Sequence, residues 1–409
     1  MAATIASVTP IMKEVYQGRI REQLRTETTI LKRITRTSAG VTNETGGKYV
    51  TFPIHTRRNQ GIGSRFEMEA LPSAGQQGYA AARVGLKYAY AALQLTGQAI
   101  SLTDTNPKAF AKALDDEVTS LKNDVKVDQN RQVYGSGNGS IGVTRTVVTA
   151  VNVITVVDAR AFQIGMIVDI ITLPTTVSVS ARTITAIDLT AGANTITLSG
   201  AAITTTVGQI IVRSGSGVAA AGNREMTGLS AIISATGTLY NVDPTVEPEW
   251  TSEISANGGT LRAVSEGLMT QMVDRIRTRG GKTTLIVQSL GVRRAYANLL
   301  TQTKSTVNTV DFVGGFKGLA FTTDGEQGEI PIVSDVDAPL NSQIFLNEDS
   351  LTYYRDEEWH WLDRDGSMWK QVTDSSGRYD AYLAQLVEYH ELGCDRRNTN
   401  GRIDDLTEA

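Results

Sequence analysis

Several short stretches of the chain carry residue types that perform chemistry in other proteins, and phosphate binding is the first to consider. Gly280-Gly281-Lys282-Thr283 has the ending of a phosphate-binding loop. That loop needs a glycine five positions before Gly281, where this chain has Ile276. The loop also joins a strand to a following helix, whereas the pattern here predicts a helix that leads into a strand. We therefore interpret the two glycines as a helix end.

Metal binding and catalysis find no support in the positions of the His, Cys and acidic residues. None of His55, His360 and His390 has a second His at zinc-binding spacing. The segment 363–366 begins like a calcium loop but lacks the later carboxylate. Cys394 is the only cysteine, which excludes a disulfide framework and a cysteine-based zinc site. We predict no catalytic residues, no metal, no cofactor and no enzyme activity.

The composition indicates a globular chain that is not a dedicated nucleic-acid-binding protein. The 409 residues are 41% hydrophobic and 20% charged, with a net charge of −4. A dedicated nucleic-acid binder usually carries a basic surplus. Because the chain has no apolar run of about 18 residues, no membrane span is expected. The first residues lack the blocks of a signal peptide, so a soluble, unexported product is expected.

A long hairpin is predicted between Arg57 and Leu102. Residues 65–70 alternate charged and apolar side chains, Pro72 and Gly75 break the strand, and residues 84–90 alternate on the way back. An isolated two-stranded ribbon is marginal in water, so this one needs a neighbour to lie on. We expect an adjacent subunit to cover the apolar stripe, while charged residues make ionic contacts at its rim. The stripe comprises Phe66, Met68, Val84, Leu86 and Tyr88, and the charged set comprises Arg65, Glu67, Glu69, Arg83 and Lys87.

The spacing of apolar residues predicts a long helix at 107–134, which Asn106-Pro107 opens and Gly135 ends. At 1.5 Å per residue it is roughly 40 Å long, enough to span a domain. Its narrow apolar stripe comprises Phe110, Leu114, Val118, Leu121 and Val125. A shorter amphipathic helix is predicted from Thr9-Pro10 to about Arg25.

The composition changes after this helix. Residues 141–213 contain no Lys and no Glu and are rich in Thr, Val and Ile, in short strands separated by turns. This pattern indicates a small closed β module, and the Gly- and Ala-rich stretch 214–222 reads as a flexible linker. The remainder predicts an α+β arrangement. Near its end, Trp359 and Trp361 belong to an aromatic cluster that is either a subunit-interface anchor or local packing.

The order of these parts resembles the major capsid proteins of tailed bacteriophages, which have the HK97-like fold. The most recognisable stretch runs from Phe316 through Ile330-Pro331-Ile332-Val333 to Ile344-Phe345-Leu346-Asn347. The resemblance implies an α+β fold with an inserted small all-β domain. The implied parts are an N-terminal arm (1–56), an E-loop hairpin (57–95), a P-domain (96–140 and 343–395), the inserted domain (141–222), an A-domain (223–342) and a C-terminal tail (396–409).

The resemblance also implies a function. The chain would self-assemble as pentamers and hexamers into an icosahedral head shell that encloses double-stranded DNA without sequence-specific binding. Assembly would occur in the host cytoplasm, with a portal, a separate scaffolding protein and a decoration protein as partners. An encapsulin-like compartment is the alternative within the fold. A hydrolase with an appended β-domain is the alternative from another class, and it would need a convergent acid, base or nucleophile cluster.

Overall fold

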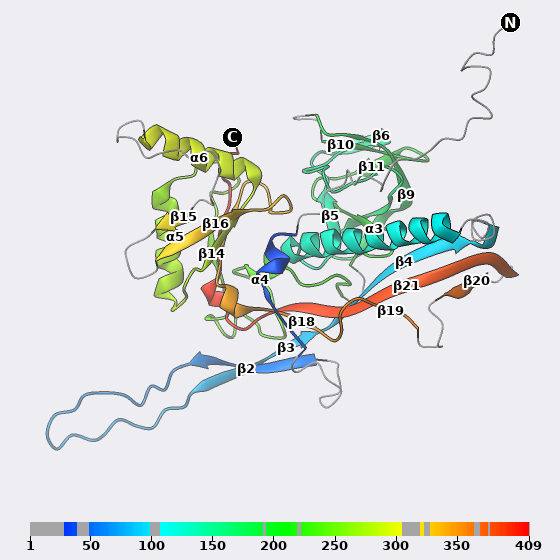
Figure 1. Ribbon diagram of the computed structural model, residues 1–409. Coiled ribbons are helices and arrows are strands. Elements are labelled where there is room, and N and C mark those ends of the chain that lie inside the picture. Colours follow the sequence, from blue (N-terminus) through cyan, green and yellow to red (C-terminus); the bar gives the residue numbers. More distant parts are fainter. Residues whose placement is uncertain are drawn as a thin grey trace, which may run out of the picture.

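The computed structural model describes residues 28–38, 49–98, 107–190, 194–218, 222–304, 320–322, 328–363, 369–374 and 377–408. The predicted N-terminal helix and residues 316–319 lie outside these ranges, and the side chains of Phe110 and Leu114 are likewise not described. Figure 1 shows a long helix lying over an extended sheet, a barrel beside the helix, a second α+β unit, and a hairpin that leaves the body.

The strand β21 (Gly377–Cys394) organises the sheet under the long helix. One of its edges pairs with β4 (Lys87–Thr96) over ten residue pairs. The other edge pairs with β18 (Leu351–Arg355), β19 (His360–Trp361) and β20 (Lys370–Asp374), and β1 (Thr35–Thr37) extends the sheet beyond β18. The predicted one-face alternation of Tyr382, Ala384, Leu386, Glu388 and His390 is confirmed, and the last four are buried.

The long helix α3 (Pro107–Tyr134) has the predicted bounds. Its C-terminal residues Val133 and Tyr134 enter the main hydrophobic core, where they meet α4 (Leu229–Ile232) and the short η2 (Ile30–Lys32). Val118, Leu121 and Val125 are only half-buried. The helix is therefore anchored at its C-terminal end, while its predicted stripe is incompletely covered within one subunit.

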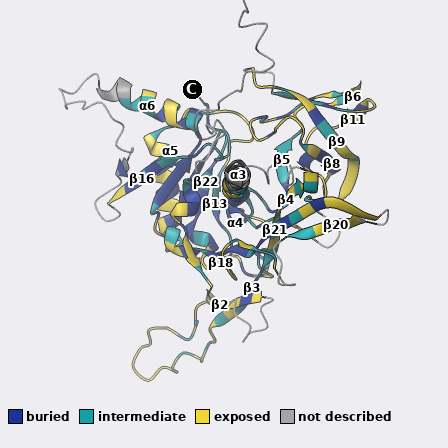
Figure 2. Ribbon diagram, turned by 45° about the vertical axis from the view of Figure 1, so that its right-hand side comes forward, coloured by how far each residue is buried: buried dark blue, intermediate teal, exposed yellow. Residues whose placement is uncertain are grey.

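The hairpin differs from its prediction. β2 (Tyr49–Arg57) pairs with β3 (Gly78–Gly85), and residues 58–77 between them are extended without forming a strand, so the predicted outgoing strand 65–70 is wrong. The predicted continuous stripe is wrong as well, because the chain changes sheets at Leu86. Val84 is buried against Val50 at the base of the hairpin, far along the chain from Phe66. Figure 2 shows the outer part of the hairpin as mostly exposed.

Residues 140–213 form a barrel. The strand order is β5 (Ser140–Val143), β12 (Ile210–Arg213), β8 (Ile167–Thr172), β9 (Thr176–Asp188), β10 (Thr195–Leu198) and β7 (Val153–Thr155). A bridge between Thr144 and Val156 joins the two ends of this order and closes the sheet. The ribbon of β6 (Val148–Val151) and β11 (Ile203–Thr205) covers the same core. Closure removes free strand edges, which suits a sequence this rich in Val, Ile and Thr.

The second α+β unit is built on a six-stranded sheet. Its order is β13 (Glu253–Ser255), β22 (Gly401–Ile403), β17 (Gln343–Leu346), β14 (Leu285–Gln288), β16 (Glu329–Ser334) and β15 (Ala320–Thr322). The helices α5 (Glu266–Thr278) and α6 (Leu290–Lys304) pack on one face, and the other face joins the core at the end of α3.

Three domain limits from the sequence need correction. The hairpin spans 49–85 and not 57–95, because β2 pairs with β3 while β4 belongs to the sheet of β21. Residues 396–409 are not a tail, because β22 pairs with both β13 and β17 inside the six-stranded sheet. Strand β17 belongs to this sheet too, although residues 343–395 were assigned to the P-domain as a whole. Both segments are short, and their neighbours in the sheet are distant in sequence, so local periodicity does not reveal the pairing.

Arg397 holds the start of the last segment in place. Its side chain is 1% exposed and pairs with no carboxylate among the described residues. Burial lowers the pKa of its guanidinium. The guanidinium donates hydrogen bonds to the carbonyl oxygens of Ile232, Ala231, Thr236, Gly237 and Trp250, at 2.8–3.3 Å. One buried cation thus organises the chain between α4 and β13 through its backbone.

Replacing this cation should destabilise the fold. Arg397→Met would leave several buried carbonyl groups without donors, and we expect it to lower the free energy of unfolding by about 3 kcal/mol or more. Urea denaturation of the two proteins measures the difference. Arg396→Met is the matched control, because Arg396 is half-exposed and its change should stay within about 0.5 kcal/mol. Equal losses in both variants would contradict the assigned role.

Glu391 gives the fold a pH dependence. This carboxyl group is 2% exposed and accepts hydrogen bonds from the amides of Thr227, at 2.6 Å, and Leu392, at 3.2 Å. Burial outweighs these bonds and raises the pKa of Glu391 from 4.5 to about 8. The folded protein therefore keeps a proton there that the unfolded chain releases near its ordinary pKa. The resulting stability is complete below that pKa and is lost as the pH rises through about 8.

Glu391→Gln removes this titration and keeps an acceptor oxygen. We expect the melting temperature of this variant to fall less than that of the parent between about pH 5 and about pH 9. Scanning calorimetry at both pH values measures the slope. The exposed Glu249→Gln should reproduce the parent slope. A parent slope that is unchanged in Glu391→Gln would contradict the prediction.

Candidate subunit-contact surfaces

The hairpin tip is a defined turn with its apolar side chains in solvent. The amide of Glu69 donates to the carbonyl of Phe66 at 3.2 Å, and the amide of Phe66 donates to the Glu69 carboxylate at 3.1 Å. Arg65 Nε donates to the Ala70 carbonyl at 3.0 Å. This turn directs Phe66, which is 84% exposed, and Met68, which is 101% exposed, away from the backbone. Glu67 lies between them and is exposed.

The arms behind the tip are held together by a side chain instead of a strand ladder. Asn59 donates to the carbonyl of Gly75 at 3.0 Å and accepts from the amide of Gly61 at 2.7 Å. Ile62 and Leu71 are 88% and 85% exposed. Together with the tip they form an apolar surface that no described part of the same chain covers, and soluble monomers rarely leave such a surface in water.

The other predicted contact residues lie near the base of the hairpin, apart from the tip. Arg83 is exposed on β3, whose Ala82 and Val84 enter the body. Lys87 is used within the subunit, since its Nζ donates to the Asn223 carbonyl at 2.7 Å. Tyr88 is 63% exposed and packs edge-on against Tyr389, with ring centroids 4.9 Å apart.

Of the two tryptophans, Trp359 lies beside α3 and Trp361 lies on β19, and both are half-buried. Tyr353 of the predicted aromatic cluster is instead a core residue, 3% exposed. The structure therefore brings Lys87, Tyr88 and Trp359 to one cavity and leaves residues 65–69 and Trp361 elsewhere.

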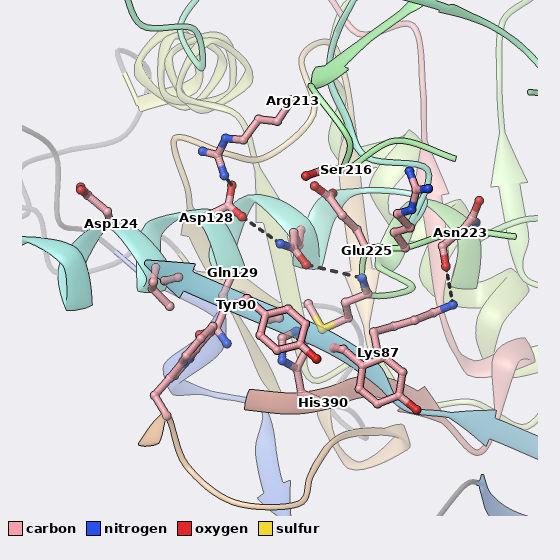
Figure 3. A pocket seen from close by; sticks show the side chains of 18 of the residues that line it. Lys87, Tyr90, Asp124, Asp128, Gln129, Arg213, Ser216, Asn223, Glu225 and His390 are labelled. Carbon is pink, nitrogen blue, oxygen red and sulfur yellow. Dashed lines mark hydrogen bonds and ion pairs between the residues drawn. The ribbon is translucent and has the colours of Figure 1, made fainter. Parts of the chain in front are cut away.

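This cavity of about 810 Å³ lies between α3, β4 and the chain that leaves the barrel (Figure 3). Its wall holds an ionic network that the sequence did not indicate. Asp128 accepts from Arg131 at 3.1 Å and pairs with Arg213 at 3.0 Å, while Arg131 pairs with Glu225 at 2.7 Å. Against the opposing effect of burial, the two guanidinium groups lower the pKa of Asp128 to about 2.

The network fixes the barrel to the helix. Arg131 also donates to the carbonyl of Ser140 at the first barrel strand, and Arg224 donates to the carbonyls of Gly215 and Gly217 at 2.9 and 3.1 Å. The described part of the predicted flexible linker 214–222 is therefore clamped by side chains. Its glycines suggested flexibility, but the nearby Arg224 and the distant Asp169 of the barrel, which accepts from the Gly215 amide at 3.0 Å, hold it in place.

A second polar group lies under the C-terminal part of α3. Glu388 accepts hydrogen bonds from Gln129 and, at 3.3 Å, from the Tyr353 hydroxyl. Burial and this carboxylate raise the pKa of Tyr353, so its hydroxyl remains a donor. His390 stacks on the Tyr353 ring, with centroids 5.4 Å apart, and its Nδ1 lies 3.2 Å from the carboxylate. This arrangement connects a helix to two strands through buried hydrogen bonds.

Chemistry of other kinds finds little support in the described part of the chain. There, no three His, Cys, Asp or Glu side chains gather closely enough to hold a metal ion. No helix in the described residues has the length and hydropathy to span a membrane. Burial raises the pKa of the Cys394 thiol to about 12, which keeps it protonated.

Comparison with solved structures shows the fold. The chain is similar to the Cyanophage A-1(L) capsid asymmetric unit, with a TM-score of 0.61, 16% identity, and coverage of 99% of this chain and 100% of that one. A Mycobacterium phage Bobi chain has a TM-score of 0.49 and 11% identity, with 99% of each chain covered. The SrpI encapsulin of Synechococcus elongatus has a TM-score of 0.47 and 9% identity, with 100% and 96% covered.

No curated protein matches the chain. The family model described as SU10 major capsid protein matches residues 9–407, which include the helix, the hairpin, the barrel and both large sheets. The predicted HK97-like capsid fold is therefore confirmed. The chain belongs to the SU10 major capsid protein family and is a capsid shell protein.

Proposed function

We propose that this capsid protein assembles as pentamers and hexamers into an icosahedral head shell that encloses the double-stranded DNA of a tailed phage. The observation that carries the proposal is the hairpin, whose outer half presents Ile62, Phe66, Met68 and Leu71 to solvent in a single subunit. A family match over residues 9–407 supports a shell as the context. In such a shell, a neighbouring subunit would cover these side chains.

The division into a packed body and a projecting hairpin suits a shell. Subunits in pentamers and hexamers meet at different angles, so shared contacts need rigid surfaces and the remaining contacts need an adaptable arm. The body is held by the β21 ladder and by buried groups such as Arg397. The hairpin beyond Arg57 has no strand pairing and adapts at little cost.

The charge of the chain suits a container for DNA. Because its net charge is −4, the protein encloses DNA without binding tightly to the phosphates and without sequence-specific contacts. We infer a structural role without catalysis. We also infer assembly in the host cytoplasm with a portal, a separate scaffolding protein and a decoration protein.

The barrel is proposed as an autonomous domain on the outer surface, where its bulk takes no volume from the genome. Its two ends meet, because the Val218 amide donates to the Asn138 carbonyl at 3.1 Å. Asp128 and Arg213 attach it to the helix through an ion pair. This attachment supports a role in stabilising the subunit and bracing its neighbours.

The hairpin proposal is tested by making its tip polar. Phe66→Asp with Met68→Asp should leave the melting temperature of the subunit unchanged, because the two side chains contact little within it. We expect the variant to lose shells, since each site forfeits about 1.5–3 kcal/mol of apolar burial and buries a charge. Negative-stain microscopy and sedimentation measure assembly.

The control is Val207→Asp, which alters an apolar side chain that is 61% exposed on the barrel. It should assemble like the parent. Normal shells from the tip variant would contradict the hairpin proposal. Parent particles that carry enzyme cargo and no DNA would favour the encapsulin-like alternative.

The barrel proposal is tested by expressing residues 138–218 alone. Because the ends adjoin and the sheet closes on its own core, the fragment should give dispersed amide signals and a cooperative thermal transition. A disordered NMR spectrum would reject autonomy. Density for the barrel on the inner face of reconstructed shells would reject the placement.

A further inference from the structure

A buried carboxylate, that of Asp335, lies where the long helix meets the second α+β unit. Asp335 follows β16 directly, and it is 3% exposed. Figure 1 shows the C-terminal end of α3 at this junction. The described groups that donate hydrogen bonds to the carboxylate are neutral, namely the side-chain amide of Asn130 and the backbone amide of Asp337. Because buried carboxylates are normally paired with a cation or bound to a metal ion, Asp335 is a candidate metal ligand.

A second carboxylate, that of Asp337, lies beside the first and is half-buried. Both carboxylates share the side-chain amide of Asn130, a completely buried residue of α3. The amide nitrogen lies 3.3 and 3.2 Å from the two oxygens of Asp335, and 2.7 Å from Oδ2 of Asp337. Two carboxylates at such a shared site repel each other unless a positive charge lies between them.

The amide of Asn130 leaves one of its own atoms unsatisfied. Its oxygen Oδ1 is buried and has no hydrogen-bond partner among the described residues. A half-turn of the amide exchanges its nitrogen and oxygen and moves no other group. The oxygen then stands at the present nitrogen position, about 2.7–3.3 Å from three carboxylate oxygens.

These separations match the spacing of oxygen ligands around calcium. Calcium binds oxygen at about 2.3–2.6 Å, so neighbouring ligands in its coordination shell lie roughly 2.7–3.4 Å apart. Calcium also accepts a carboxylate through both oxygens, and the amide of Asn130 is nearly equidistant from the two oxygens of Asp335. The arrangement therefore suits a calcium ion after one rotation of a side-chain amide.

Tyr134, one helical turn after Asn130, supplies an independent indication. It is 4% exposed, and its hydroxyl has no partner in hydrogen-bonding geometry among the described residues. The hydroxyl nevertheless lies close to the two carboxylates, because burial and then the charges of Asp335 and Asp337 raise the pKa of Tyr134 well above its ordinary value. Buried polar groups rarely remain unsatisfied. A water molecule bound to an ion between the carboxylates would satisfy this hydroxyl.

The basic residue that acts on this loop, Arg160 of the barrel, does not replace such an ion. Hydrogen bonds to Asp158, and after them the charges of Asp158, Glu408 and Asp337, raise the pKa of Arg160. Its guanidinium pairs with Asp158 at 2.6 Å, and its side chain is 39% exposed. A buried ion is better placed than this side chain to balance the charge of Asp335.

We propose that Asp335, Asp337 and Asn130 form a calcium site that joins the C-terminal end of α3 to the second α+β unit. Both oxygens of Asp335, one oxygen of Asp337 and Oδ1 of Asn130 bind the ion, and water completes its shell. The site has only two carboxylates, and Asn130 lies 205 positions before Asp335, so the sequence did not indicate it. The inference revises the prediction of no metal and is independent of shell assembly.

Calcium-dependent stability tests the site. The full-length subunit is freed of metal with a chelator, and its melting temperature is measured by scanning calorimetry with and without Ca²⁺. We expect Ca²⁺ to raise the melting temperature of the parent, because a ligand that binds only the folded state stabilises it. Asp335→Asn should abolish this increase. Asp337→Asn should weaken Ca²⁺ binding at least about tenfold in isothermal titration calorimetry.

The matched control is Asp274→Asn, which changes an exposed carboxylate of α5. It should keep the calcium-dependent increase of the parent. If Asp335→Asn does not fold, Asp337→Asn decides the test, because Asp337 is half-buried and its change to Asn preserves the shape of the side chain.

Terbium luminescence locates the ion. Tb³⁺ replaces Ca²⁺ at oxygen sites and emits when a nearby aromatic ring transfers its excitation energy. The parent should show Tb³⁺ emission that added Ca²⁺ removes by displacement. Tyr134→Phe should lose most of this emission, because phenylalanine transfers energy poorly, and should still be stabilised by Ca²⁺.

Three results would overturn the inference. If Ca²⁺ leaves the melting temperature of the parent unchanged, hydrogen bonds alone hold the two carboxylates. If Ca²⁺ binds the parent and Asp337→Asn equally, the ion is adventitious and lies elsewhere. Tb³⁺ emission that persists undiminished in Tyr134→Phe would likewise place the ion away from this junction.

Discussion

The pairing of β4 with β21 is the constraint on which the rest of the subunit depends. It joins residues 87–96 to residues 381–390, so the chain that leaves the hairpin is bound to the chain that closes the fold. One face of this ladder is covered by α3, and the outer edge of β21 pairs with β18, β19 and β20. Because β18 and β21 also enter the main core, the ladder fixes the long helix, the hairpin base and the second sheet relative to one another.

Polar groups position the parts that apolar packing leaves underdetermined. The stretch of α3 from Val118 to Val125 is only half-buried, yet just beyond it Gln129 reaches Glu388, and Asp128 reaches Arg213 of the barrel. Buried ionic and hydrogen-bonded groups contribute little net stability against an apolar replacement, but they discriminate strongly against misplaced arrangements. Many copies of a shell protein must adopt the same internal arrangement, so polar groups that disfavour other arrangements are useful to it. Such discrimination explains why a barrel attached through a Gly-rich segment is held in one orientation.

Apolar side chains remain uncovered at two places on a single subunit. The exposed apolar groups of the hairpin tip and the half-covered stripe of α3 are two different surfaces, and a heterologous contact with a neighbouring subunit would cover each of them. A contact of this type closes into rings when its rotation is suitable. The subunit thus has well-packed cores but leaves apolar surfaces exposed, as expected of a protein that is covered by its neighbours in a shell.

The sequence by itself determined the features that depend on local periodicity and composition. Pro107 and the spacing from Val118 to Val125 located the long helix, and the loss of Lys and Glu after Ile141 located the barrel. The sequence also indicated the overall order of parts. Tertiary structure decided what depends on distant partners. Residues 401–403 became an internal strand because β13 and β17 flank them, and Val84 turned inward because Val50 lies opposite. The Gly215 amide finds Asp169, and Arg213 finds Asp128, in segments far apart in the chain, and only folding brings such groups together.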